Sequence, residues 1–147
     1  MTYNDVLETA IPQFTDEGRE VVLQVMGRSM LPFIVGSRDS VVLVKITHTP
    51  RVGDIVLAKT RESGYVIHRV DSISEKGTYA LLGDGNLKWR EHCKLDDIHA
   101  LAIAVILPGG RRRSLQYGFW AKVWRKLLPV RRYLLWIYKK THKQYET

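Results

Sequence analysis

Six short segments rich in Val, Ile and Leu follow one another along the chain, each of strand length and each bounded by turn-forming residues. The segments are EVVLQVM, SVVLVKI, DIVLAKT, YVIHRV, TYALL and IHALAIAVIL, between residues 20 and 107. They are separated by stretches such as VGSRD, HTPRVGD, SEKG and GDGN, which are typical of turns and loops. Because no helical pattern intervenes, the sequence predicts a mainly β fold, an antiparallel sheet or partial barrel.

Helical spacing is confined to the two ends of the chain. Residues 3–11 predict a short helix with Val6, Leu7 and either Ala10 or Ile11 on its apolar side. Beyond LPGGRRR the period becomes helical again, and a basic amphipathic helix is expected. Its apolar stripe consists of Leu115, Phe119, Val123 and Leu127. We therefore predict two parts, a β domain over residues 1–110 and a helical tail over residues 111–147.

Composition supports one folded domain, and charge sets the tail apart from it. The chain has 147 residues, of which 45% are hydrophobic, so a modest core can form. Residues 1–110 carry a charge balance of −2, whereas residues 111–147 carry +10. The single cysteine, Cys93, excludes an internal disulfide, and we expect an inert thiol. His48, His92, His99 and His142 lack the spacing of metal ligands with one another, and we expect neither metal nor cofactor.

The basic tail predicts an anionic partner, because aromatic rings alternate with Lys and Arg along it. We favour the surface of an anionic membrane over nucleic acid, since no nucleic-acid-binding motif accompanies the tail. The expected contact residues are Phe119, Trp120, Lys122, Trp124, Arg125, Lys126, Arg131, Arg132 and Trp136. No apolar run is long enough to span a bilayer, and no export signal is visible at the N-terminus. The expected location is therefore cytoplasmic, peripheral at the membrane.

Four short motifs in a fixed order indicate the chemistry. They are Gly27-Arg28-Ser29-Met30-x-Pro32, RVGDIVLA at 51–58, VIHRV at 66–70 and LLGDGN at 81–86. A serine hydroxyl is a weak nucleophile unless a neighbouring base accepts its proton, and histidine is suited to that role at neutral pH. This layout, over residues 20–107, resembles the signal peptidase I and LexA-like serine peptidases.

The resemblance implies a role for each motif. Ser29 would be the nucleophile, and His68, followed by Arg-Val as in the endoplasmic-reticulum and archaeal signal peptidases, would be the base. Asp84 would be the third member, with Asp96 or Asp97 as alternatives. The substrate and oxyanion side of the site is assigned to the residues around the serine: Gly27, Arg28, Met30 and Pro32. Lys45 and Lys59 are alternative bases, although solvated strand lysines are the simpler interpretation.

The predicted function is therefore a serine endopeptidase acting on a peptide or protein substrate associated with membranes or export. Signal peptidases have a second serine where this chain has Gly27, which favours an alternative: a catalytically inactive adaptor that binds peptides or a membrane surface. A third hypothesis is a LexA-like self-cleaving regulator. It ranks last because the first 26 residues contain neither a DNA-binding helix pair nor an Ala-Gly cleavage site.

Overall fold

The computed structural model describes residues 2–16, 18–27, 30, 34–85, 89–115 and 136. The chain begins with helix α1 (Tyr3–Ala10) and the short 3-10 helix η1 (Ile11–Gln13). Thr2 caps α1 through a capping box: its hydroxyl accepts from the Asp5 N–H, and the Asp5 carboxylate accepts from the Thr2 N–H. The apolar side of α1 buries Leu7 and Ala10, so the predicted N-terminal helix is confirmed.

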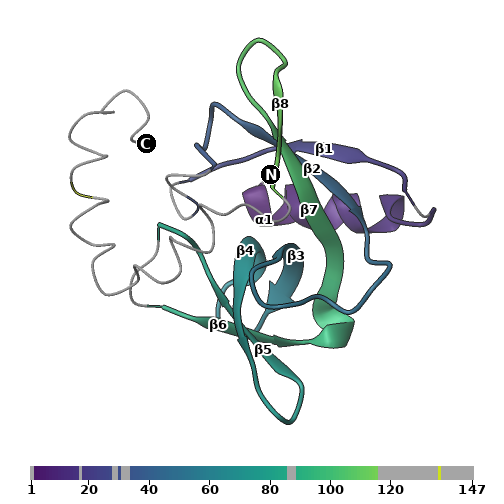
Figure 1. Ribbon diagram of the computed structural model, residues 1–147, viewed down its shortest axis with the longest axis vertical. Helices are drawn as coiled ribbons and strands as arrows, with labels where there is room; N and C mark the ends of the chain where they lie inside the picture. Colours follow the sequence, from purple (N-terminus) through teal and green to yellow (C-terminus); the bar gives the residue numbers. More distant parts are fainter. Residues whose placement is uncertain are drawn as a thin grey trace.

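One antiparallel sheet contains all eight described strands. The order of the strands is β1-β2-β7-β3-β4-β5-β6, and β8 pairs with the C-terminal end of β7. The strands are β1 (Val21–Gln24), β2 (Ser40–Lys45), β3 (Ile55–Thr60), β4 (Gly64–Ile73), β5 (Thr78–Leu82), β6 (Glu91–Lys94), β7 (Ile98–Ile106) and β8 (Arg112–Ser114); the 3-10 helix η2 (Leu95–Asp97) precedes β7. Strand β7 runs through the middle of the molecule and joins its two halves (Figure 1).

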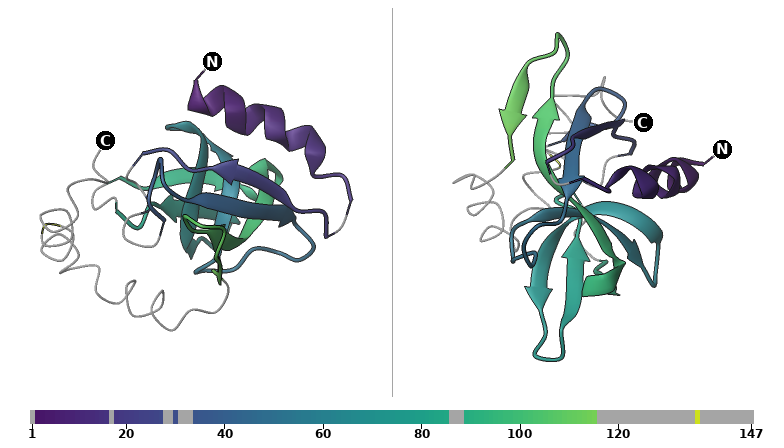
Figure 2. Two further views of the ribbon diagram at one scale, coloured as in Figure 1. Left: turned by 90° about the horizontal axis from the view of Figure 1, so that it is seen from above. Right: turned by 90° about the vertical axis from the view of Figure 1, so that its right-hand side faces the viewer.

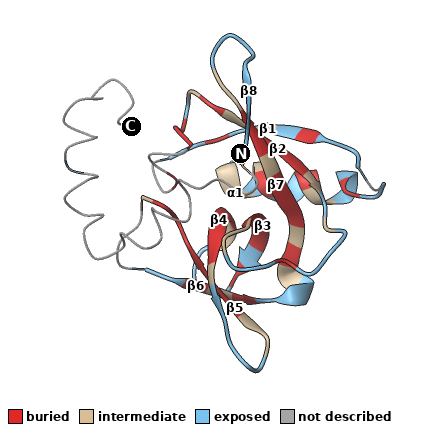
Figure 3. Cartoon of the chain, viewed as in Figure 1, coloured by how far each residue is buried: buried red, intermediate tan, exposed pale blue. Residues whose placement is uncertain are grey.

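The sheet curls into a half-barrel, and this curl creates two hydrophobic clusters. The first cluster lies between α1 and the sheet and includes Leu7, Leu43 and Leu57. The second cluster lies within the curl of β3–β6 and includes Val56 and Leu81. Figure 2 shows α1 against one side of the sheet, and Figure 3 shows the buried residues along β3, β4 and β7.

Strand β3 separates the two clusters, which explains the run of four apolar residues over Ile55–Ala58. Successive side chains of a strand point to opposite faces, so a strand between two cores needs apolar residues at both parities. Ile55 and Leu57 face the first cluster, whereas Val56 and Ala58 face the second. Strand β4 follows the same rule, with Ile67 in the first cluster and Val66 and Val70 in the second.

The six predicted strands correspond to β1–β5 and β7, so the predicted mainly β fold is confirmed. Strands β6 and β8 were not predicted. Arg112–Ser114 pair with β7, so these three residues of the predicted tail belong to the sheet, and the two-part division stays a prediction. An ion pair between Arg112 and Glu20 links this strand to the residue that precedes β1.

Candidate active site

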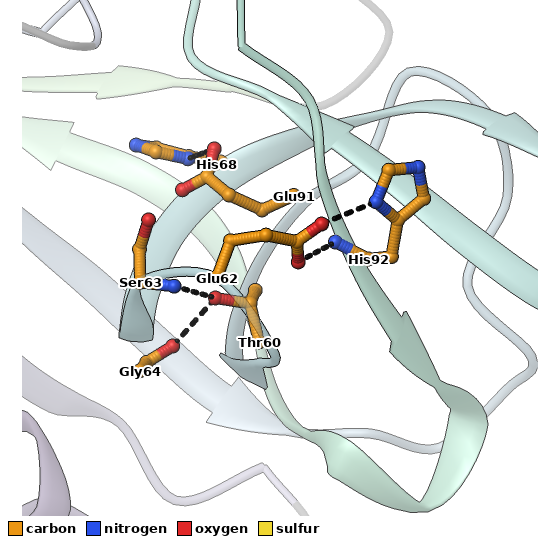
Figure 4. A network of polar contacts seen from close by, with 7 residues as sticks. All are labelled: Thr60, Glu62, Ser63, Gly64, His68, Glu91 and His92. Atoms are coloured by element: carbon orange, nitrogen blue, oxygen red, sulfur yellow. Dashed lines mark hydrogen bonds and ion pairs between the residues drawn. The ribbon is translucent and has the colours of Figure 1, made fainter.

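The predicted base, His68, lies on β4 with its side chain inside the curl of the sheet. It shares its face of the strand with Val66 and Val70, because residues two positions apart in a strand point to the same side. Its Nδ1 lies 3.1 Å from Oε1 of Glu91 on β6, and the two side chains are only 8% and 5% exposed. At this distance a carboxylate is placed to accept a hydrogen bond from an Nδ1–H and so to fix the orientation of the ring. The pair therefore has the geometry that orients a histidine base (Figure 4).

Asp84 does not occupy that position. Its two carboxylate oxygens accept hydrogen bonds from Nε and Nη2 of Arg69, at 2.8 and 2.7 Å. Both side chains are buried, and Arg69 also donates from Nη1 to the carbonyl of Gly53. The structure does not bring Asp84 to Nδ1 of His68: Glu91 lies there, and Asp84 forms a buried ion pair with the neighbouring arginine.

This ion pair brings three of the four sequence motifs together. Arg69 belongs to VIHRV, Gly53 to RVGDIVLA, and Asp84 to LLGDGN. The backbone adds to the contact, since the Val70 N–H donates to the Asp54 carbonyl and the Gly53 N–H to the Val70 carbonyl. The spacing of the motifs along the sequence thus corresponds to one packed arrangement around the end of β4.

The described residues on both flanks of the first motif are anchored to one another. Gly27 has a φ of +84°, a left-handed conformation that favours glycine. Gly36 packs directly on it: a Cβ at Gly36 would come within 2.6 Å of the Gly27 nitrogen. Asp39, fully buried, accepts from the Val35 N–H, and its own carbonyl accepts from the Val25 N–H. The GSRDS segment, residues 36–40, is therefore packed against the residues that precede the motif.

Three residues of the first motif that were predicted to belong to the site lie outside the described residues: Arg28, Ser29 and Pro32. Met30 is described, and its side chain is 2% exposed within the first cluster. Its side chain therefore packs in the core, and its assignment to the substrate side stays a prediction. Gly27 retains its assignment as a prediction.

The alternative site residues have structural positions. Lys45 and Lys59 are exposed; the Lys59 ammonium lies 5.7 Å from the centre of the Tyr65 ring. Asp97 accepts from the Lys94 N–H and caps η2, and Asp96 is exposed on the same short helix. Within the described ranges, no group of His, Cys, Asp and Glu side chains is arranged to hold a metal ion.

Most of the predicted membrane contacts lie outside the described residues: Phe119, Trp120, Lys122, Trp124, Arg125, Lys126, Arg131 and Arg132. Trp136 is described, is helical, and is 57% exposed. In the part of the chain that the structure covers, no helix has both the length and the apolar character to cross a bilayer.

Glu91 is the site residue that sequence reasoning missed. Strand β6 has only four residues, EHCK, and three of them are polar or charged, so it offers almost no hydrophobic period. Its one signal is alternation: Glu91 and Cys93 are buried, whereas the residues that follow each are more exposed. A buried glutamate requires a partner, and only the fold shows that the partner is His68.

The curled sheet with a short N-terminal helix is the kind of fold found in LexA-like and signal-peptidase-like proteins. The family model described as Peptidase S24-like matches residues 2–104, more than two thirds of the chain, so the chain belongs to the Peptidase S24-like family. The resemblance inferred from the four motifs is thereby confirmed at the level of the family. No curated protein and no solved structure matches the chain.

Proposed function

We propose that the chain is a serine endopeptidase in which Ser29 is the nucleophile, His68 the general base and Glu91 the residue that orients it. The observation that carries the proposal is the buried His68–Glu91 pair, with 3.1 Å between Nδ1 and Oε1. Burying two ionisable groups is costly, and a fold retains them most readily where they serve a purpose other than stability. Family membership and the position of the serine after a left-handed glycine are consistent with it.

The proposed reaction uses these groups in two stages. Ser29 Oγ attacks the carbonyl carbon of the peptide bond while its proton passes to Nε2 of His68, and Glu91 stabilises the imidazolium. The imidazolium then gives the proton to the leaving amine, and water hydrolyses the acyl-enzyme by the reverse transfer. The N–H of Ser29 is the proposed oxyanion donor.

The substrate is proposed to be an extended segment of a peptide or protein. In the described sheet β1 is one of the two end strands, and it leads through two residues into Gly27. An extended chain paired along β1 would bring its carbonyl carbons toward the serine, since main-chain hydrogen bonds to a sheet edge align a peptide. The basic tail, residues 111–147, is proposed to hold the enzyme at an anionic membrane surface, close to substrates that are associated with membranes or export.

The test is cleavage of a peptide library, read by mass spectrometry, together with labelling by an acylating serine probe. Ser29→Ala and His68→Ala should each lower kcat by about 10⁴-fold or more, because a serine without its base is nearly inert. Glu91→Gln should lower kcat by roughly 10²- to 10⁴-fold, because a neutral amide neither fixes the tautomer nor stabilises the imidazolium. Exposed His48 provides a matched control in His48→Ala. Undiminished cleavage and labelling in Ser29→Ala would overturn the proposal.

A further inference from the structure

A second histidine–carboxylate pair lies beside the first, where β6 returns to the turn between β3 and β4. The Glu62 carboxylate on that turn accepts from the His92 N–H at 2.8 Å, and its other oxygen lies 2.6 Å from His92 Nδ1. The Arg61 N–H donates to the His92 carbonyl at 3.1 Å. His92 is thus held by its amide, its carbonyl and its ring, and Figure 4 shows the amide and ring contacts with Glu62.

The turn that presents Glu62 is itself ordered. The hydroxyl of Thr60, a residue only 5% exposed, donates to the Gly64 carbonyl and accepts from the Ser63 N–H. Gly64 has a φ of +69°, and the Asn4 side chain of α1 packs against it. The Glu62 side chain therefore projects from a turn with a defined conformation toward β6.

His92 is the residue directly after Glu91, and this adjacency couples the two pairs. Adjacent residues of a strand share a peptide unit and point to opposite faces. Fixing the amide of His92 therefore fixes the peptide that follows Glu91, and with it the direction in which the Glu91 side chain leaves the strand. Strand β6 has only four residues. It is held by β5 on one side and by the Glu62 turn on the other, so the contact with Glu62 is a large part of what positions it.

We propose that Glu62 is a positioning residue: by holding His92, it keeps the Glu91 carboxylate on Nδ1 of His68. This inference rests on the proposed function, because the alignment affects proton transfer only if His68 is the base. Catalytic groups act within narrow geometric tolerances, and a displacement of about 1 Å in a supporting element can cost on the order of 10²-fold in rate.

A purely structural role for Glu62 predicts a different outcome. Glu62 and His92 are 43% and 41% exposed, and exposed ion pairs contribute little to stability. If Glu62 were an ordinary surface pair, its removal would change neither the environment of His68 nor the rate of cleavage. If it is a positioning residue, both change while the fold persists.

The experiment compares Glu62→Ala and Glu62→Gln in the full chain, with Glu20→Ala as the matched control. Glu20 is also an exposed carboxylate paired through both oxygens, but its partner, Arg112, is on β8. Nitrogen NMR shifts of the His68 ring report its tautomer without requiring activity, and peptide cleavage gives kcat and KM separately. Urea unfolding verifies that each variant folds.

We expect Glu62→Ala to lower kcat by roughly 10- to 100-fold with little change in KM, and to shift the His68 ring signals away from the Nδ1–H tautomer. Glu62→Gln should recover much of both readouts, because its amide oxygen can still accept from the His92 N–H. Glu20→Ala should match the wild type. A wild-type protein without cleavage would overturn the proposed function, whereas unchanged His68 signals in Glu62→Ala would overturn this inference whatever the activity.

Discussion

Replacement of Asp84 by alanine separates a structural from a catalytic role for the residue that the sequence placed in the site. Asp84 and Arg69 are 1% and 4% exposed, and two hydrogen bonds of 2.7 and 2.8 Å join them. Asp84→Ala leaves a buried guanidinium without its carboxylate, and breaking a buried pair in this way costs about 3–5 kcal/mol. That is a large part of the roughly 5–15 kcal/mol that stabilises a typical domain.

Urea unfolding followed by tryptophan fluorescence measures this loss. With a dependence of about 2 kcal/mol per molar urea, a loss of about 4 kcal/mol shifts the midpoint by roughly 2 M. Asp71→Ala is the matched control, because Asp71 forms an ion pair with Arg90 but the two side chains are 19% and 41% exposed. For that pair we expect a loss of about 0–1 kcal/mol.

A double variant distinguishes lost pairing from lost packing. Arg69→Met with Asp84→Val removes both charges and keeps the volume comparable, so it should recover much of the stability that Asp84→Ala loses. A loss below about 1 kcal/mol in Asp84→Ala would refute the reasoning from burial. A stable Asp84→Ala protein without cleavage would return Asp84 to the catalytic group.

Three further outcomes follow from single contacts. Gly36→Ala should destabilise the loop before β2 by about 1–3 kcal/mol in urea unfolding, because the new methyl group overlaps the Gly27 backbone; an unchanged midpoint would contradict the close packing. Burial raises the pKa of the Cys93 thiol to about 11, so iodoacetamide should modify the native protein very slowly at pH 8 and rapidly in urea. Hydrogen bonds from His92 lower the pKa of Glu62 below its ordinary 4.5. Its stabilisation is therefore present above pH 4.5 and lost as the pH falls through the lowered pKa; the difference in unfolding free energy between wild type and Glu62→Gln should shrink toward zero below that pH.

The local pattern of the sequence was sufficient for most of the strands and for α1. Each predicted strand carries apolar residues that face at least one hydrophobic cluster, and β3 carries them for both. The residues of each segment alone therefore indicate that it is a buried strand. Strands β6 and β8 have no such pattern. Strand β8 has three residues, all exposed, and forms because β7 extends past the end of β3 and offers it unpaired backbone groups.

The sequence alone predicted the mainly β fold, the peptidase resemblance and His68 as the candidate base, because these depend on short-range periodicity and on motifs in a fixed order. Which carboxylate meets that histidine was decided by the tertiary structure. Asp84 and Glu91 are 16 and 23 positions from His68 in the chain, and both are buried acids. The curl of the sheet brings Glu91 on β6 to His68 on β4, and Arg69 forms the ion pair with Asp84. The sequence could not decide between the two acids, because the partner of a buried charge is set by distance in space and not by distance along the chain.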